Sequence, residues 1–168
     1  WPTVKGMAAE GNVYTGFLYA GLMIDQAGNP KVIEFNCRFG DPETQPVMLR
    51  LQSSLILLIE AAFAEALDKV EAQWDPRPSL GVVLAAGGYP GDYAKGAAIH
   101  GLPQAAELAG KVFHAGTVLQ AGQIVTSGGG VLCATALGNS VAEAQQQAYR
   151  LAAQIEQSSR STRDDLHC

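Results

Sequence analysis

The stretch from Val32 to Glu43 holds the residues of this 168-residue chain whose types and spacing could do chemistry. If the stretch is an extended strand, its side chains alternate between two faces. The polar members then share one face, namely Glu34, Asn36 and Arg38. The apolar members share the other and are expected to point to the core, namely Ile33, Phe35 and Cys37.

The polar face suits a metal and a phosphate. Glu34 and Asn36 offer oxygen atoms, which hard cations such as Mg²⁺ prefer, and Mg²⁺ is usually held by one or two protein oxygens, waters and substrate phosphates. The guanidinium of Arg38 can meet a phosphate as a planar fork. One strand face could therefore present a metal–nucleotide site. The alternative is a half-exposed strand whose polar residues only face water, and spacing alone favours it.

The segment 41–43, which ends this stretch, has two interpretations. Asp41 as an N-cap with Pro42 at the first helical position predicts a helix start. Asp41 and Glu43 could instead order a substrate amine or steady a metal shell. The pattern favours capping for Asp41 and leaves Glu43 undecided. The glycine-rich segments 87–93 and 127–130 lack the spacing of a phosphate-binding loop. Tight turns between strands explain 127–130 better, whereas 87–93 could be a turn or could line a surface with its two tyrosines.

The first half of the chain predicts the elements that position these residues. Segments 13–24 and 31–37 read as two strands of a hairpin around a turn cluster at 25–30. A short helix is expected over 46–51, and a longer one begins at Ser53 or Ser54 and runs to about Leu67. Its apolar positions with helical spacing are 55, 56, 59, 63 and 67.

The second half differs, and residues 74–78 are the predicted domain boundary. Short β-prone runs separated by glycine suggest a small antiparallel sheet or partial barrel. These runs are 80–86, 97–102, 111–119, 122–126 and 130–137. A capping box of Ser140 and Glu143 precedes a helix over 141–157. The apolar stripe expected to pack on the sheet is Val141, Ala144, Ala148, Leu151 and Ile155. Residues 158–168 are expected to form a frayed polar tail.

Composition narrows the function classes. Hydrophobic residues make up 48%, which is ample for a core, and the net charge of −5 argues against nucleic acid as a partner. The most apolar stretch, 55–67, is interrupted by Glu60 and Glu65 and is too short to span a membrane. The three cysteines, one of them Cys133 in an apolar strand, favour a reducing, cytoplasmic compartment. Because the chain opens at Trp1, we expect it to be a piece of a longer protein.

Several long strings resemble one enzyme family, the phosphoribosylamine–glycine ligases of the ATP-grasp superfamily. In the first half they are KGMAAEG (5–11), TGFLYAGL (15–22) and EFNCRFGDPETQ (34–45). In the second half they are AAGGYPGDY (85–93), IHGL (99–102) and VFHAGT (112–117). The resemblance runs from about residue 3 to 157, whereas the tail does not follow the family's basic C-terminal stretch.

The resemblance implies an activity and roles. The family joins glycine to 5-phosphoribosylamine with ATP, through a glycyl phosphate, in purine biosynthesis. Glu34 and Asn36 match its ligands for Mg²⁺ (or Mn²⁺) beside the nucleotide. By the same analogy Arg38 touches the transferred phosphoryl group as a catalytic residue, and Gly40 and Asp41 border the phosphoribosylamine pocket.

The resemblance also implies an α+β fold in three parts. Residues 1–75 are the C-terminal part of an ATP-grasp domain, built of an antiparallel sheet plus helices. Residues 76–157 are the family's C-terminal domain, and 158–168 are a divergent tail. Because half of the nucleotide clamp is missing, we expect no activity from this chain alone, and its uncovered strands predict self-association. Two alternatives are a free-standing non-catalytic module and an ATP-grasp ligase with another acceptor, which the strings disfavour.

Overall fold

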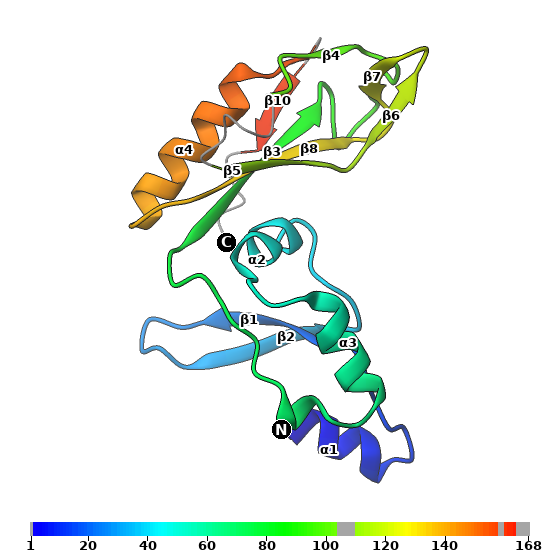
Figure 1. Cartoon of the computed structure of the whole chain (residues 1–168), viewed down its shortest axis with the longest axis vertical. Coiled ribbons are helices and arrows are strands. Elements are labelled where there is room, and N and C mark those ends of the chain that lie inside the picture. The colour runs from blue at the N-terminus through cyan, green and yellow to red at the C-terminus, as the bar shows by residue number, and fades with distance from the viewer. Residues whose placement is uncertain (1, 104–109, 158–159, 164–168) are drawn as a thin grey trace. The chain divides into compact units, whose positions relative to one another are not determined.

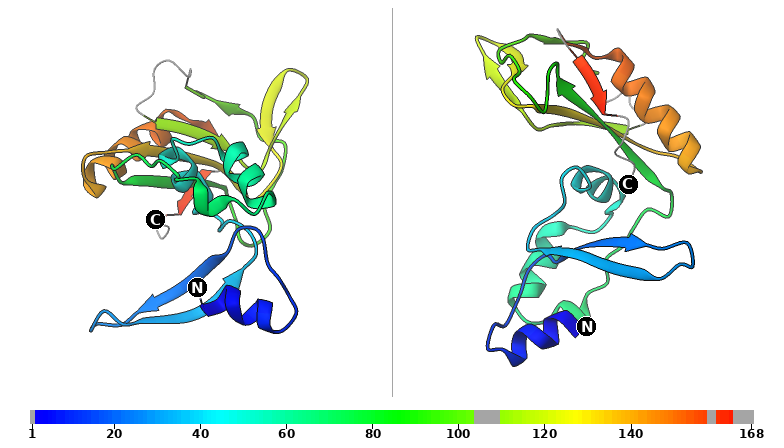
Figure 2. Two further views of the ribbon diagram at one scale, coloured as in Figure 1. Left: turned by 60° about the horizontal axis from the view of Figure 1, so that its bottom comes forward. Right: turned by 180° about the vertical axis from the view of Figure 1, so that it is seen from behind.

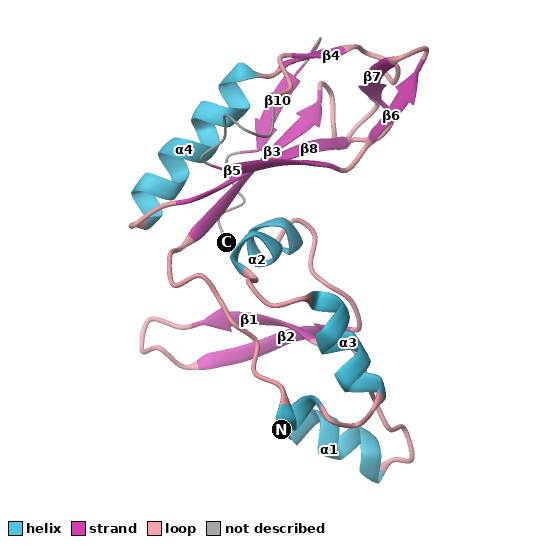
Figure 3. Ribbon diagram, in the orientation of Figure 1, coloured by secondary structure: helices cyan, strands magenta, loops and turns pink. Residues whose placement is uncertain are grey.

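A computed structural model describes residues 2–103, 110–157 and 160–163. The fold is α+β with antiparallel sheets, as the sequence predicts (Figure 3). The chain divides into two compact units, which are described separately. The first unit is Trp1–Asp41 with Gln52–Gln73, and the second is Pro42–Leu51 with Trp74–Cys168. The second unit resumes at Trp74 and also takes ten residues from the first half, Pro42–Leu51, so it is built from two separate segments of the chain.

The first unit is a two-stranded hairpin with short helices. In chain order its elements are α1 (Pro2–Ala9), β1 (Tyr19–Ile24), β2 (Pro30–Asn36), α3 (Leu55–Phe63) and the 3₁₀ helix η1 (Leu67–Lys69). The hairpin agrees with the predicted strands, although β1 is shorter than the segment 13–24. Helix α1 is not among the predicted elements, and it buries no residue.

Helix α3 departs from its prediction in length and in the face that packs. Ser54 caps it as expected, its hydroxyl accepting the Leu57 N–H, but the helix ends at Phe63 rather than near Leu67. Glu65 then adopts a left-handed φ of 53°, which stops the helix. The half-buried residues of α3 include Leu55, Leu58, Ile59 and Ala62, whereas Ile56 and Phe63, which we expected on this face, are exposed.

The first unit has little core of its own. Ile33 is 64% exposed and Phe35 is 45% exposed, so the expectation that this strand face points to a core is wrong for this chain. Cys37 is also exposed and lies just beyond the end of β2. Alternation identifies two faces of a strand, but it does not supply an element to cover either face. Among the described residues, every buried hydrophobic side chain belongs to the second unit.

The second unit is built on a four-stranded antiparallel sheet with the strand order β10-β3-β8-β5 (Figure 1). Its remaining strands form two small pairs, β4 with β9 and β6 with β7. The elements are α2 (Thr44–Arg50), β3 (Ser79–Ala86), β4 (Ile99–His100), β5 (Gly110–His114), β6 (Thr117–Gln120), β7 (Gln123–Thr126), β8 (Gly130–Leu137), α4 (Val141–Gln154), β9 (Glu156–Gln157) and β10 (Arg160–Arg163). The predicted run 111–119 is therefore two strands.

Helix α4 covers one face of this sheet, and the views of Figure 2 show it from two further sides. Ser140 caps the helix by accepting the Glu143 N–H at 3.2 Å. The Glu143 carboxylate accepts the N–H of Asn139, one residue before the cap, at 2.8 Å. Ala144, Ala148 and Leu151 are buried as predicted. Val141 is 63% exposed and does not belong to the packed stripe, and Ile155 is buried but follows the end of the helix.

Part of the expected tail is a strand. Residues 160–163 form β10, which pairs antiparallel with β3, so the expected frayed tail is wrong for these four residues. The rest of the expected tail lies outside the described residues. Cys133 is buried in β8 as a core residue, as predicted. In the part of the chain that the structure describes, no helix is long and apolar enough to cross a bilayer.

Candidate functional site

The hairpin of β1 and β2 positions the predicted metal ligands, and its turn fixes the register. Asp25 Oδ1 accepts the N–H groups of Ala27 and Asn29, each at 2.9 Å. The hydrogen bonds from Asn29, foremost, hold the pKa of the Asp25 carboxyl below its usual value. With this turn the strands pair so that Glu34 lies opposite Gly21 and Asn36 opposite Tyr19.

Glu34 and Asn36 lie together, as their two-residue spacing predicts. Asn36 Nδ2 donates a hydrogen bond to Glu34 Oε1 at 2.9 Å. Across the hairpin, Gly21 leaves room for the Glu34 side chain, because a Cβ on Gly21 would lie 3.2 Å from Glu34 Cγ. The structure therefore brings one carboxylate and one amide side by side on an exposed strand.

The chain beyond β2 carries the other predicted site residues. Arg38 is exposed, and its Nη1 donates to the carbonyl of Phe39 at 3.0 Å. The Phe39 ring stacks at a tilt on Phe17, with 4.2 Å between centroids. Gly40 is buried and Asp41 is exposed. All five predicted site residues thus lie within eight positions in the first unit.

The loop before β1 adds contacts that sequence reasoning missed. The Tyr14 hydroxyl donates to the Phe17 carbonyl at 2.5 Å. Burial, foremost, raises the pKa of Tyr14, and its interaction with the Cys37 thiol acts in the same direction. Loop residues and the end of β2 are therefore neighbours. Gly16 and Gly21 are the sequence feature from which close contacts here could have been predicted. A Cβ at Gly16 would meet the Tyr14 side chain, and one at Gly21 would meet that of Glu34.

The expected helix start at Asp41 is wrong. Residues 41–43 form a turn, and α2 begins at Thr44. The N-cap residue is Glu43, whose side chain makes no capping hydrogen bond. An Asp–Pro pair is compatible with a turn as well as with a helix start, because proline fixes φ at a value that both share. Asp41 is consequently not used as a cap in this structure.

The glycine-rich segment 87–93 and His114, both in the second unit, make local contacts. Segment 87–93 is a turn after β3, and the Tyr89 and Tyr93 rings meet edge to face at 5.9 Å. The His114 Nδ1 lies 2.9 Å from the Thr117 hydroxyl, across the turn between β5 and β6. Among the described residues, no group of three or more histidine, cysteine, aspartate or glutamate side chains could hold a metal.

The donor chemistry of Glu34 and Asn36 nevertheless fits a magnesium ion that a nucleotide brings. Mg²⁺ needs only one or two protein oxygens when waters and phosphates complete its shell. The Glu34 carboxylate and the Asn36 amide supply that number on one face, and the basic Arg38 follows two residues later. These two side chains alone are too few to complete the coordination shell of a metal ion.

Two family models match this chain. Residues 1–44 match the family model described as "Phosphoribosylglycinamide synthetase, ATP-grasp (A) domain", so the chain contains part of an ATP-grasp domain. Residues 79–167 match the model described as "Phosphoribosylglycinamide synthetase, C domain". The chain belongs to the phosphoribosylglycinamide synthetase family. The C-domain match extends into the segment that we expected to diverge.

Named relatives point to the same enzyme. The chain is 81% identical over 156 residues to phosphoribosylamine–glycine ligase of Pseudomonas syringae pv. tomato, covering 93% of this chain and 36% of the relative. It is 68% identical over 156 residues to that of Escherichia coli, covering 92% and 36%. The crystal structure of phosphoribosylamine–glycine ligase from Thermotoga maritima superposes with a TM-score of 0.80 at 36% identity, covering 96% of this chain and 39% of that one. The chain therefore spans little more than a third of these relatives.

Proposed function

We propose that this chain is the C-terminal part of a phosphoribosylamine–glycine ligase. The observation that carries the proposal is its 81% identity over 156 residues to the Pseudomonas syringae enzyme. The complete enzyme would join glycine to 5-phosphoribosylamine with ATP in purine biosynthesis. Its partners are then these small molecules, with no nucleic acid or membrane, and the cytoplasm is its predicted location.

The reaction has two steps. A carboxylate oxygen of glycine attacks the γ-phosphorus of ATP, which forms glycyl phosphate and releases ADP. The amine of phosphoribosylamine then attacks the acyl carbon, and the C–O bond to phosphate breaks. The products are glycinamide ribonucleotide and phosphate, and the amine loses a proton. Both steps move negative charge onto phosphate oxygens, so positioned cationic groups stabilise them.

In this mechanism the chain supplies the end of β2. Glu34 and Asn36 would hold the divalent ion, which would neutralise negative charge on the phosphates when bound. The Arg38 guanidinium would stabilise the negative charge of the transferred phosphoryl group by donating paired N–H hydrogen bonds to its oxygens. Gly40 and Asp41 would border the phosphoribosylamine pocket, where a glycine admits a close ligand and a carboxylate accepts hydrogen bonds from an amine. The grouping of all five residues at one end of one hairpin supports these roles.

The chain alone is predicted to be inactive, because phosphoryl transfer depends almost entirely on positioning by groups on several sides of the phosphates. The test replaces the matching segment of the Pseudomonas syringae ligase with this chain. The chimaera should form glycinamide ribonucleotide from glycine, phosphoribosylamine and MgATP, whereas the isolated chain should not exceed a blank without protein. A folded but inactive chimaera would favour the alternative, a non-catalytic module derived from an ATP-grasp enzyme.

Within an active chimaera, the Glu34→Gln variant tests the metal assignment. Loss of the carboxylate should lower kcat on the order of a hundredfold or more, because charge stabilisation of several kcal/mol is lost. Glu60→Gln is the matched control, since Glu60 is an exposed glutamate on α3 and should leave kcat unchanged. Equal activity of the two variants would remove Glu34 from the proposed site.

A further inference from the structure

Two segments of the first unit meet at the end of the hairpin opposite to its turn. β1 begins at Tyr19 and β2 ends at Asn36, and these two residues are register partners. The segment before β1 and the segment after β2 therefore leave the same end of the hairpin. The rings of Phe17 and Phe39 stack there, with 4.2 Å between their centroids and 35° between their planes. All of these residues belong to the first unit.

The loop 14–17, which carries the Phe17 ring, is closed on itself. The Tyr14 hydroxyl donates to the Phe17 carbonyl at 2.5 Å. Gly16, between them, has a φ of 150°, which residues with a side chain rarely adopt. A Cβ on Gly16 would also lie only 2.9 Å from the Tyr14 hydroxyl oxygen. Glycine at this position therefore lets the tyrosine fold back and hold the backbone of Phe17.

Arg38 lies between two residues that contact this loop. On one side of it, the Cys37 thiol interacts with the Tyr14 hydroxyl. On the other side, the Phe39 ring stacks on Phe17. The Arg38 guanidinium is itself attached to one of these neighbours, because its Nη1 donates to the Phe39 carbonyl at 3.0 Å. The loop thus restrains the chain immediately before and immediately after the arginine.

Resting on the proposed function, we propose that Phe17 is a positioning residue for Arg38 and acts through the ring of Phe39. Aromatic pairs of this kind stabilise a defined geometry beyond the area that they bury. An arginine stabilises charge on a phosphoryl group only when its N–H donors already point to where that charge develops. Fixing Phe39 fixes the backbone from which Arg38 reaches, so Phe17 serves the phosphoryl-transfer step without touching a substrate.

The role predicts an effect on kcat rather than on substrate binding. In the active chimaera, Phe17→Ala should lower kcat on the order of tenfold or more, because a small displacement of a group that acts in the transition state is costly. KM for glycine and for phosphoribosylamine should change less than about twofold. Phe17→Tyr keeps the stacked ring and should keep kcat within about twofold of the wild-type value. A loss in Phe17→Tyr as large as that in Phe17→Ala would contradict a role for the ring contact.

A double-mutant cycle tests whether the effect passes through the arginine. In an Arg38→Ala chimaera, Phe17→Ala should lower kcat by less than about a further twofold, because the group that it positions is already gone. A purely structural role would lower kcat by the same factor in both backgrounds, and that result would overturn the inference. An unchanged kcat in Arg38→Ala alone would overturn it as well, since Arg38 would then need no positioning.

Leu18→Ala is the matched control. Leu18 follows Phe17 in the chain and is exposed to the same extent, 39%, but its aliphatic side chain cannot stack as an aromatic ring does. The variant should change kcat less than about twofold. Equal losses in Leu18→Ala and Phe17→Ala would overturn the inference while leaving the proposed function intact. A folded wild-type chimaera without activity would instead contradict the proposed function.

A second measurement needs no activity. In the chimaera, Phe17→Ala should speed amide hydrogen exchange at residues 37–40 relative to β1 and β2, because the segment loses the ring that restrains it. Leu18→Ala should leave the exchange at 37–40 unchanged. Equal exchange of 37–40 in Phe17→Ala and the wild type would show that Phe17 does not hold this segment, and would also overturn the inference.

Discussion

Gly110 in the edge strand β5 lies directly against the backbone of Thr135 in β8. A Cβ on Gly110 would overlap the Thr135 carbonyl oxygen and would lie 2.8 Å from Leu151 Cδ1 on α4. The missing side chain therefore lets α4 and the edge strand approach each other. Glycine is needed here for space rather than for an unusual backbone angle.

Substituting Gly110 by alanine should therefore destabilise the second unit by about 1–3 kcal/mol, because backbone atoms cannot move aside for a methyl group. Urea unfolding followed by circular dichroism measures the change. Gly130→Ala is the matched control: it lies in β8 of the same sheet, and nothing lies within 4 Å of its added Cβ. Equal midpoints for the two variants would contradict the packing argument.

A substitution in the turn between β6 and β7 should raise the stability of the chain. Ala121 and Gly122 both have left-handed backbones, with φ of 48° and 80°, as a two-residue hairpin turn requires. Asparagine tolerates this conformation better than alanine, so Ala121→Asn should stabilise the chain by roughly 0.5–1 kcal/mol. The same exchange at the exposed helical Ala153 should destabilise it slightly, because asparagine is the poorer helix former. A lower melting temperature for Ala121→Asn would show the reasoning to be wrong.

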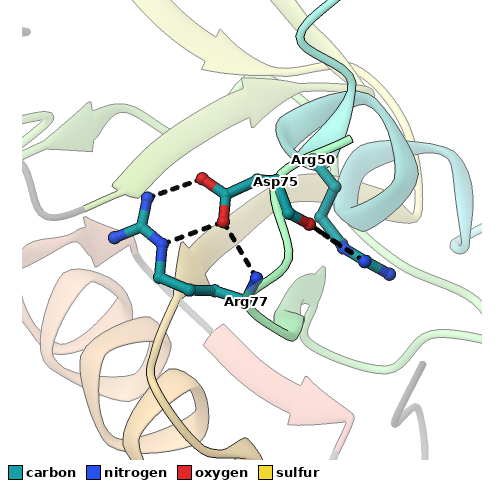
Figure 4. A network of polar contacts seen from close by, with 3 residues as sticks. All are labelled: Arg50, Asp75 and Arg77. Carbon is teal, nitrogen blue, oxygen red and sulfur yellow. Dashed lines mark hydrogen bonds and ion pairs between the residues drawn. The ribbon is translucent and has the colours of Figure 1, made fainter. Parts of the chain in front are cut away.

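The free energy of unfolding should fall in acid, because the Asp75 carboxylate becomes protonated. Hydrogen bonds from the Arg77 side chain, foremost, lower the pKa of Asp75 to about 2 (Figure 4). The unfolded value is about 3.9, so the contribution is fully present above about pH 4 and is lost as the pH falls through 2. The Asp75→Asn variant should lose this part of the pH dependence. Denaturant titrations between pH 5 and 2 compare the two, and parallel curves would exclude Asp75 as a source.

Self-association of the isolated chain remains a prediction, and the hairpin is its expected site. Ile33 is 64% exposed in β2, and both strands have open edges. A charge on this strand should oppose pairing, so Ile33→Lys should shift the chain toward monomer in light scattering. Leu119→Lys is the control, because Leu119 is 70% exposed but lies in the β6–β7 hairpin. A wild-type chain that is already monodisperse and monomeric would refute the prediction.

The elements that the sequence predicts well are those with local signals. Ser140 and Glu143 mark the start of α4 because a capping box forms within one turn. Glu34 and Asn36 lie together because a strand repeats every two residues. The outward exposure of Ile33 could not be predicted, since alternation does not tell which faces have partners. The hydrogen bond from Arg50 to the Asp75 carbonyl could not be predicted from the sequence either. The acceptor is a backbone carbonyl 25 residues away, and every residue type has one.

The interleaved order of the second unit has a consequence for synthesis on the ribosome. Residues 42–51 emerge early, but the surface that buries Pro46 belongs to β3 and β8, and β8 ends only at Leu137. Since domains generally fold as units, α2 cannot dock until that later sheet has been made. A nascent chain released before Leu137 would carry the proposed metal ligands but would lack the complete sheet on which α2 packs.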